Sequence, residues 1–528
     1  MINKINRVIL CIIDDLRSEH LFNFIDKGLL PNIKTIMENG IYSKNCVTDF
    51  PSITYPTQVS MITGTYTGDY RKELCHGVPL TNWMGRNSIH PFLRSYLAKD
   101  MQIYKLNEDL GINCQSILEM VGEGNTASIA QFISRGAKYF FPERKTKLAM
   151  YYLVLTHLRN RKQLMIRANS IIVQKLLDNY KNPKKYFDVK EPPIVSLICF
   201  ISSDLLMHVY GFNSPIYKLN LLHIDKVIGY LISGLDKLGY LEDTMIVITS
   251  DHGNYKANEV GELTNFFKAN KLTHYHPRKN RKGNMDLAEY GGVGFFNFKG
   301  NVKSNDLHSW ARPIINELKN YGEKKVNLLK KLFKIKGTQL MYYRDDENTP
   351  IKGKIYIKRK FSDTNRIISG IIEYHGIGHE YKTRYIVEND DRDVFNYITD
   401  EKASKIIDGK FHSINEWLSA TYHLDFPLYP DLLPRHFKNP RSCDIILSNE
   451  GNIVYNIEHG KQKNRTIYHH DIGLRKSSIV PLIIGGSLEI PHKEIPYCKI
   501  VDIVPTLIKS LGKTPHKSVI GESLIYNY

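Results

Sequence analysis

Short apolar runs rich in β-branched residues recur along the chain and alternate with helix-like stretches. The clearest strand candidates are nearly continuous in Val, Ile and Leu, which is typical of strands buried on both faces; they are residues 8–13, 194–201, 245–249 and 479–484. Helical spacing of apolar residues covers 57–62, 221–238 and 500–511. This alternation predicts an α/β fold with a mostly parallel central sheet flanked by helices.

The middle of the chain has a different pattern. Residues 339–343, 353–359 and 367–374 alternate between apolar and polar positions, as antiparallel strands do. We therefore expect an inserted, strand-containing lobe at 264–440 that shapes substrate access. The catalytic core would then combine residues 1–263 with 441–528.

The beginning of the chain and its cysteines bear on the cellular setting. The first apolar run ends in Asp14 and Asp15 without a small-residue cleavage site, so it is read as a buried strand and not as a signal peptide. No stretch approaches the roughly 18 apolar residues that a membrane span needs. Seven scattered cysteines without a CxxC pair argue against a disulfide framework or a cysteine zinc site. We expect a cytoplasmic protein.

Composition narrows the classes of partner. With 42% apolar and 24% charged residues the chain is ordinary globular protein. A net charge of +18 fits either an anionic partner or lysines spread over a solvated surface, and the dispersed lysines favour the second. The densest basic patch, 323–336, is predicted to be a helix docked by its apolar face. No recognised nucleic-acid motif occurs, so nucleic-acid binding is not expected.

Residues of the metal-ligand type follow three of the predicted strands. Asp14 follows the first, Asp204 the second, and Asp251 with His252 the third. Ligands of open α/β sheets bind beyond the carboxyl ends of the strands, so these side chains are expected to share one site. His208 stands four residues after Asp204, a spacing that puts both on one face of a helical turn.

Thr54 stands where a nucleophile could act on phosphate. The helical pattern begins near Pro56, and proline is favourable in a first helical turn. A residue just before a helix N-terminus lies at a phosphate-receptive position, and a divalent cation can activate a hydroxyl there. The alternative is that Thr54 is a plain N-cap.

Together these motifs resemble the type I phosphodiesterase / nucleotide pyrophosphatase family of the alkaline phosphatase superfamily. The resemblance covers most of the chain and rests on the order and spacing of several segments. They are Asp14 to Arg17, Thr54 to Pro56 with 61–64, His76 and Gly77, Asp204 to His208 with Gly211, Ser250 to Gly253, 480–484 and 503–507.

The resemblance implies an alkaline-phosphatase-like core and hydrolysis of a phosphate ester through a phosphoryl-threonine at Thr54. The small phosphorylated substrate would be a phosphodiester or a nucleotide pyrophosphate. It also implies two divalent metal ions, with zinc preferred and manganese the alternative. One ion would be held by Asp14, Thr54, Asp251 and His252, and the other by Asp204, His208 and a late histidine.

Two features of the resemblance leave alternatives open. The late histidine is assigned to His470 by its spacing from Pro481, with His469 as the alternative, because Asp471 replaces the glycine of the usual His-Gly pair. Asn82 would donate to a phosphoryl oxygen. Arg17 would either neutralise substrate charge or form a salt bridge near Asp14.

Other functions on the same fold remain open. They are phosphomonoester or phosphonate hydrolysis, and a non-catalytic relative, to which the change at Asp471 lends weight. Sulfate hydrolysis is disfavoured because the sulfatase signature is missing around residue 54. The natural substrate and the oligomeric state do not follow from the sequence.

Overall fold

A large mixed sheet forms the centre of the computed structural model. The structure describes residues 5–68, 74–86, 89–97, 102–143, 147, 161–301, 310–388, 391–456, 467–487 and 490–525. The sheet has nine strands in the order β21-β2-β20-β8-β1-β7-β5-β6, with β22 also paired to β2. Only β20 runs antiparallel to its neighbours, so the predicted α/β class with a mostly parallel sheet is confirmed.

Three buried parallel strands lie in the middle of this sheet. β1 (Arg7–Ile13) pairs with β7 (Val195–Phe200) on one side and with β8 (Thr244–Thr249) on the other. In this register Ile12 lies opposite both Cys199 and Thr249. The carboxyl ends of the three strands therefore meet at one edge, from which the three acidic segments emerge.

The outer strands extend the sheet in both directions. On the β7 side lie β5 (Thr126–Ile129) and β6 (Tyr139–Phe141). On the β8 side lies β20 (Ile479–Gly485), then β2 (Ile41–Val47), which carries β21 (Lys493–Glu494) and β22 (Cys498–Lys499) at its far edge.

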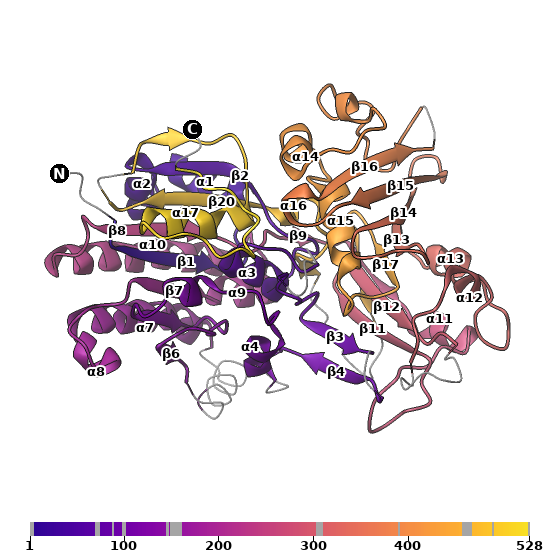
Figure 1. Cartoon of the computed structure of the whole chain (residues 1–528), viewed down its shortest axis with the longest axis horizontal. Helices are drawn as coiled ribbons and strands as arrows, with labels where there is room; N and C mark the ends of the chain where they lie inside the picture. The colour runs from indigo at the N-terminus through magenta and orange to yellow at the C-terminus, as the bar shows by residue number, and fades with distance from the viewer. Residues whose placement is uncertain are drawn as a thin grey trace.

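Helices cover both faces of the sheet because side chains alternate along each strand. Ile9 and Cys11 of β1 point into a cluster with α1 (Ser18–Asp26), α2 (Pro31–Glu38), α7 (Arg161–Lys181) and α10 (Pro215–Lys237). Val8 and Leu10 point the other way, toward α3 (Thr54–Thr63) and α17 (Ile503–Ser510). Figure 1 shows these helices around the sheet on the left side of the molecule.

A second sheet lies on the right side of Figure 1. Its seven strands follow the order β11-β12-β17-β13-β14-β15-β16 and are all antiparallel. They are β11 (Met285–Tyr290), β12 (Val293–Phe298), β13 (Leu340–Arg344), β14 (Lys352–Lys360), β15 (Ile367–His375), β16 (Lys382–Val387) and β17 (Ile445–Ser448). The additional lobe is thus present, and β17 lies beyond the predicted boundary at 440. The division of the chain into a core and an insertion, and the role of the lobe in substrate access, stay predictions.

The remaining elements are short and connect or cover these sheets. The helices are α4 (Leu106–Asp109), α5 (Ile117–Met120), α8 (Pro183–Phe187), α9 (Ser202–Tyr210), α11 (Thr264–Ala269), α12 (Ile315–Lys319), α13 (Leu328–Lys331), α14 (Ile414–Thr421), α15 (Tyr429–Lys438) and α16 (Arg475–Ser478). The strands are β3 (Asn82–Gly85), β4 (Phe92–Ser95), β9 (Tyr255–Lys256), β10 (Glu259–Glu262), β18 (Ile453–Asn456) and β19 (Tyr468–His469).

The basic patch at 323–336 differs from the long helix predicted there. Only α13 and one 3-10 turn, Leu332–Lys334, are helical. The apolar residues Leu328, Leu332 and Phe333 are buried, and the lysines are exposed. The segment packs by its apolar side as expected, but its helical part is shorter than predicted and begins only at Leu328. Within the described ranges, none of the helices is both long enough and apolar enough to cross a bilayer.

Candidate metal centre

The three central strands deliver their acidic segments to one place. Asp14 follows β1 directly, and Asp251 and His252 follow β8 after Ser250. β7 leads into α9, whose first and last turns carry Asp204 and His208. Because β1 lies between β7 and β8, the side chains of these segments converge.

One cluster of potential ligands combines Asp14, Asp204 and His252. One ligating atom from each lies within 4.8 Å of the others. Asp14 Oδ1 is 3.4 Å from His252 Nε2, and Thr54 Oγ1 is 3.1 Å from the same nitrogen. The sequence-predicted nucleophile therefore lies against this cluster.

Asp251 adjoins this cluster and is firmly oriented. Its Oδ2 lies 3.7 Å from His252 Nε2 and accepts a 2.7 Å hydrogen bond from the amide of Gln58. Its Oδ1 accepts from the backbone N–H of His252 at 3.0 Å. These bonds fix the carboxylate beside the ring of His252.

A second cluster combines Asp204, His208 and His470, again with one ligating atom from each within 4.8 Å of the others. Asp204 Oδ1 is 3.1 Å from His208 Nε2 and 3.8 Å from His470 Nε2. The Nδ1 atoms donate to backbone carbonyls, His208 to Tyr468 at 2.8 Å and His470 to Ser52 at 3.1 Å. Carbonyl partners on Nδ1 leave both Nε2 atoms as acceptors, which is how metal-binding histidines are commonly held.

The two clusters are contiguous. The rings of His252 and His470 are stacked, with centroids 3.6 Å apart and planes 4° from parallel. Asp204 belongs to both clusters. The two clusters therefore form one compact centre, with Asp204 between them.

The electrostatics of this centre favour a bound cation. Among the described residues, Asp14 Oδ1 and Asp204 Oδ1 are buried without a hydrogen-bond partner. Burial and the neighbouring carboxylates of Asp251 and Asp204 raise the pKa of Asp14 well above its usual range. Although burial lowers it, the pKa of His252 is raised to about 9 by Asp251 and Asp15. Carboxylate and imidazole together are donors that suit a divalent metal such as zinc, so the residues present fit a metal ion.

Thr54 is positioned by the start of α3. It is the first residue of that helix, after Ile53 in extended conformation, so it lies one position further in than the sequence suggested. The backbone N–H groups of a first helical turn have no partner within the helix, and such groups favour negative charge. Gln58, one helical turn later, ties α3 to Asp251.

Two residues of this centre were missed by sequence reasoning. Asp15 occupies the position of the glycine in the resembled motif and has a left-handed φ of 63°, with Oδ1 3.8 Å from His252 Nδ1. In the sequence, the only sign of this role was that Asp15 stands where the motif has glycine. Gln58 was detectable only as a polar residue four positions after Thr54.

Three motif residues lie outside the clusters. Asn82 begins β3, and its backbone N–H donates to the hydroxyl of Tyr290; its proposed contact with a phosphoryl oxygen stays a prediction. His76 is buried, and its Nε2 lies 2.9 Å from Ser60 Oγ in α3, so it supports that helix. Arg17 forms a 3.0 Å ion pair with Glu19, and its proposed role toward substrate charge stays a prediction.

His469 lies close by but faces a different partner. β19 pairs with β9 and places His469 opposite Tyr255. The Nδ1 of His469 is 3.7 Å from Asp471 Oδ2. Its ring lies edge-on to that of His208, with centroids 5.3 Å apart. The geometry favours His470 as the late ligand, and the assignment stays a prediction.

Comparison with known proteins gives a consistent picture. The family model of type I phosphodiesterase / nucleotide pyrophosphatase matches residues 8–338. An uncharacterised pyrophosphatase/phosphodiesterase of Schizosaccharomyces pombe is 24% identical over 53% of this chain and 52% of that protein. Human ectonucleotide pyrophosphatase/phosphodiesterase family member 5 is 25% identical over 48% and 46%. The aligned part thus spans about half the length of these curated relatives.

Solved structures share the fold over nearly the whole chain. Murine ectonucleotide pyrophosphatase / phosphodiesterase 5 superposes with a TM-score of 0.54 at 13% identity, covering 96% of both chains. An inactive variant of that protein, in complex with AMP, gives a TM-score of 0.53 at 13% identity, over 97% of this chain and 96% of that one. This likeness confirms the predicted alkaline-phosphatase-like core.

Proposed function

Because the chain belongs to the type I phosphodiesterase / nucleotide pyrophosphatase family, we propose that it hydrolyses a phosphodiester or a nucleotide pyrophosphate with Thr54 as nucleophile. The observation that carries this proposal is the position of Thr54 Oγ1, at a helix N-terminus and 3.1 Å from His252 Nε2. A hydroxyl there lies against the cluster of Asp14, Asp204 and His252, and the family membership supplies the reaction class.

Two divalent ions, with zinc preferred over manganese, are part of the proposal. Asp14, Thr54, Asp251 and His252 would hold one, and Asp204, His208 and His470 the other. When bound, such ions supply Lewis-acid stabilisation of charge on the phosphoryl oxygens and lower the pKa of a coordinated hydroxyl or water.

The chain itself supplies the nucleophile and its alignment. Thr54 Oγ1 forms a bond to phosphorus as the bond from phosphorus to the leaving oxygen breaks, which gives a phosphoryl-threonine. Water then attacks the same phosphorus, and the Thr54 oxygen leaves. The N–H groups at the start of α3 stabilise charge on the phosphoryl oxygens. Asn82 is proposed as a further donor to those oxygens.

A nucleotide is the substrate class that the comparisons favour. A solved structure of the murine relative holds AMP. A small phosphorylated substrate is proposed in preference to nucleic acid. Phosphomonoester or phosphonate hydrolysis on the same fold is the alternative.

A substrate screen tests the proposal. Purified protein with zinc or manganese is assayed on bis-p-nitrophenyl phosphate, p-nitrophenyl phosphate and dinucleotide pyrophosphates. Diester and pyrophosphate hydrolysis should exceed monoester hydrolysis, and Thr54→Ala should lower it at least about a hundredfold. Thr35→Ala, at an exposed helical threonine of α2, is the matched control and should keep full activity.

The screen has clear contrary outcomes. Faster monoester hydrolysis would replace the diesterase with the phosphomonoesterase alternative. Equal activity of Thr54→Ala and the wild type would exclude Thr54 as the nucleophile. No turnover of any phosphate ester, with a metal-loaded protein, would favour a non-catalytic relative.

A cytoplasmic setting also stays a proposal. It is supported by the seven cysteines, which are all buried and free, as is common in reducing compartments. Cell fractionation with a tagged full chain tests it, and recovery in the medium or in a membrane fraction would overturn it.

A further inference from the structure

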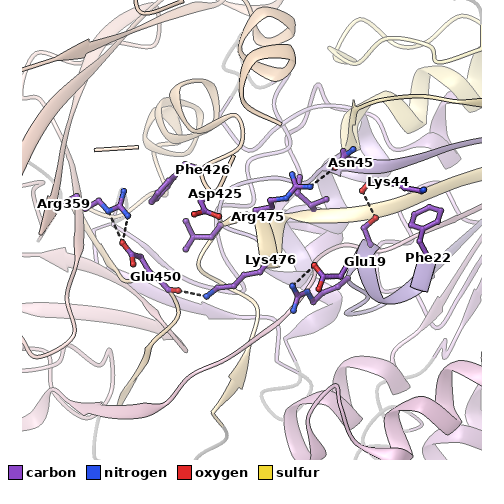
Figure 2. A pocket seen from close by; sticks show the side chains of 14 residues that line it. Glu19, Phe22, Lys44, Asn45, Arg359, Asp425, Phe426, Glu450, Arg475 and Lys476 are labelled. Atoms are coloured by element: carbon purple, nitrogen blue, oxygen red, sulfur yellow. Dashed lines mark hydrogen bonds and ion pairs between the residues drawn. The ribbon is translucent and has the colours of Figure 1, made fainter. Parts of the chain in front are cut away.

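A second cavity lies between the central sheet and the additional lobe. It has a volume of about 600 Å³, which is within the range of small-molecule sites. Its walls come from distant parts of the chain: α1 and β2 on one side, β14 and Glu450 on the other, and the start of α16 between them (Figure 2). None of the proposed metal ligands lines it.

The lining of this cavity has more positive than negative side chains. Five are cationic and three are acidic: Arg17, Lys44, Arg359, Arg475 and Lys476 against Glu19, Asp425 and Glu450. Two of the acids are already paired, Glu19 with Arg17 at 3.0 Å and Glu450 with Arg359 at 2.5 Å. Without these two pairs, Lys44, Arg475 and Lys476 remain against Asp425, so the lining keeps a positive excess.

Arg475 and Lys476 donate to uncharged acceptors. The Arg475 guanidinium bonds the carbonyl of Tyr422 at 2.5 Å and the side-chain oxygen of Asn45 at 3.0 Å. The Lys476 ammonium bonds the backbone carbonyl of Glu450 at 2.5 Å. In Figure 2 the two side chains start from neighbouring positions and point to opposite ends of the cavity, Arg475 toward Asn45 and Lys476 toward Glu450.

Both groups lie in an environment that disfavours their charge. Each is half-buried. Burial lowers the pKa of Arg475. Burial and the charge of Arg17 lower the pKa of Lys476. Asp425 opposes this effect at both positions, but it is exposed, and solvent screens it. An anion bound in the cavity would stabilise the charged forms of Arg475 and Lys476.

We propose that this cavity is a second ligand site, in which Arg475 and Lys476 bind a small phosphorylated molecule from opposite ends. An arginine fork suits a tetrahedral phosphate, and the lysine supplies a point charge for a second polar group of the same molecule. Arg17, the motif arginine, lines the same cavity, where it is paired with Glu19.

The backbone behind this cavity also supports the metal centre. The carbonyl of Lys476 accepts from the N–H of Asn254 at 3.1 Å, and the carbonyl of Ser477 accepts from the N–H of Gly253 at 2.7 Å. Ser52 Oγ bonds both Ser477 Oγ and the carbonyl of His470. If a ligand moved residues 475–477, the turns that carry His252 and His470 would move with them. A ligand in this cavity would then change the geometry of the metal centre.

Calorimetric titration of the metal-loaded full chain with inorganic phosphate tests the proposal. We expect the double variant R475Q/K476Q to lose one binding event, or to bind phosphate there at least about tenfold more weakly. Asp204→Asn should leave that event in place, because Asp204 does not line this cavity. This separates the second site from phosphate bound at the metal centre, and the result does not depend on catalytic activity.

Two controls exclude trivial losses. The charge-retaining exchange R475K/K476R should bind phosphate more tightly than R475Q/K476Q, because both charges stay although the arginine fork is moved. Lys513→Gln, at an exposed lysine, should change nothing. Equal binding by wild type and R475Q/K476Q overturns the proposal. Equal loss in the charge-retaining variant also overturns it, because the effect would then follow from altered packing and not from charge.

A second titration, with AMP, shows whether the site binds a nucleotide or the phosphate group alone. Repeating the titration with AMP on Asp204→Asn distinguishes a site for phosphate alone from a site for a nucleotide. AMP that binds at least about tenfold more tightly than inorganic phosphate, with the gain lost in the added R475Q/K476Q background, identifies a nucleotide site. Equal affinities identify a site for the phosphate group alone.

Discussion

The imidazole rings of His252 and His470 are stacked in parallel, with their centroids 3.6 Å apart. These residues are far apart in the chain, one after β8 and the other after β19. Each ring also belongs to a cluster that contains Asp204. The stack therefore joins two groups of potential ligands into one centre beside Thr54.

The two neighbouring histidines should differ in their effect on metal content. His470 Nε2 faces Asp204, whereas His469 Nδ1 lies 3.7 Å from Asp471. We expect His470→Ala to lose about one of two bound ions and His469→Ala to keep both, measured by elemental analysis after gel filtration. The reverse order would assign the late ligand to His469.

Asp204 should be needed for both ions, because it is shared by the two clusters. We expect Asp204→Asn to hold fewer than one ion per chain and to lower diester hydrolysis at least about a hundredfold. Asp236→Asn, at an exposed aspartate of α10, is the matched control. Full metal content in Asp204→Asn would remove it from the ligand set.

Asp15 should orient the ring of His252, although its own backbone has a conformation that is strained for a residue other than glycine. Its φ of 63° is a glycine-like conformation, and its carboxylate lies 3.8 Å from His252 Nδ1. We expect Asp15→Gly to lower metal affinity about tenfold or more, as loss of a partner behind a ligand does. The measurement is competition with a chelating dye.

The matched control for Asp15 is Asp188→Gly. Asp188 has a φ of 59° but is exposed, so glycine relieves the same strain without touching the centre. Metal affinity should be unchanged in this variant. A similar loss of affinity in both variants, or in neither, would contradict an orienting role for Asp15.

The buried carboxyl group of Asp286, which is not one of the proposed metal ligands, should make the stability of the protein depend on pH. Burial raises the pKa of Asp286 to about 6, against which its hydrogen bond to Asn297 and the charge of Arg86 act only partly. The folded protein thus holds this proton more tightly than the unfolded chain. The free energy of unfolding should fall as pH rises from about 4 to about 6.

Asp286→Asn removes this ionisation. We expect its free energy of unfolding to exceed that of the wild type at pH 8 by up to about 3 kcal/mol, with the difference shrinking toward pH 4. Urea denaturation at both pH values measures it. A variant that is less stable than the wild type at pH 8 would show that the charged carboxylate is stabilised by its surroundings.

Local pattern was sufficient for much of the fold and for part of the site. Strands 8–13, 194–201, 245–249 and 479–484 were predictable because strands buried on both faces are continuous in apolar residues. Asp14, Asp204 and Asp251 were predictable as neighbours because parallel strands end at one edge. His470 was predicted as the late ligand from its spacing to Pro481, and that assignment stays a prediction. The pairing of β19 with β9, which no local pattern encodes, is what places His469 beside Asp471.

Other features required the folded chain. The cavity at Arg475 and Lys476 is lined by residues that are far apart in the chain, such as Arg17 and Lys476. No local sequence pattern predicts that these charged side chains come together. The 323–336 segment was predicted as one helix, but its first residues form a turn in which Tyr321 pairs with Val326, and only Leu328–Lys334 is helical. Tertiary packing outweighs helical propensity there.

The most direct test of the account is anomalous scattering from crystals of the purified protein, with data collected at the zinc and manganese absorption edges. Two peaks are predicted, one contacting Asp14, Asp251, His252 and Thr54, and the other contacting Asp204, His208 and His470. Peaks that lie elsewhere, or an ordered centre without any peak after incubation with either metal, would contradict it.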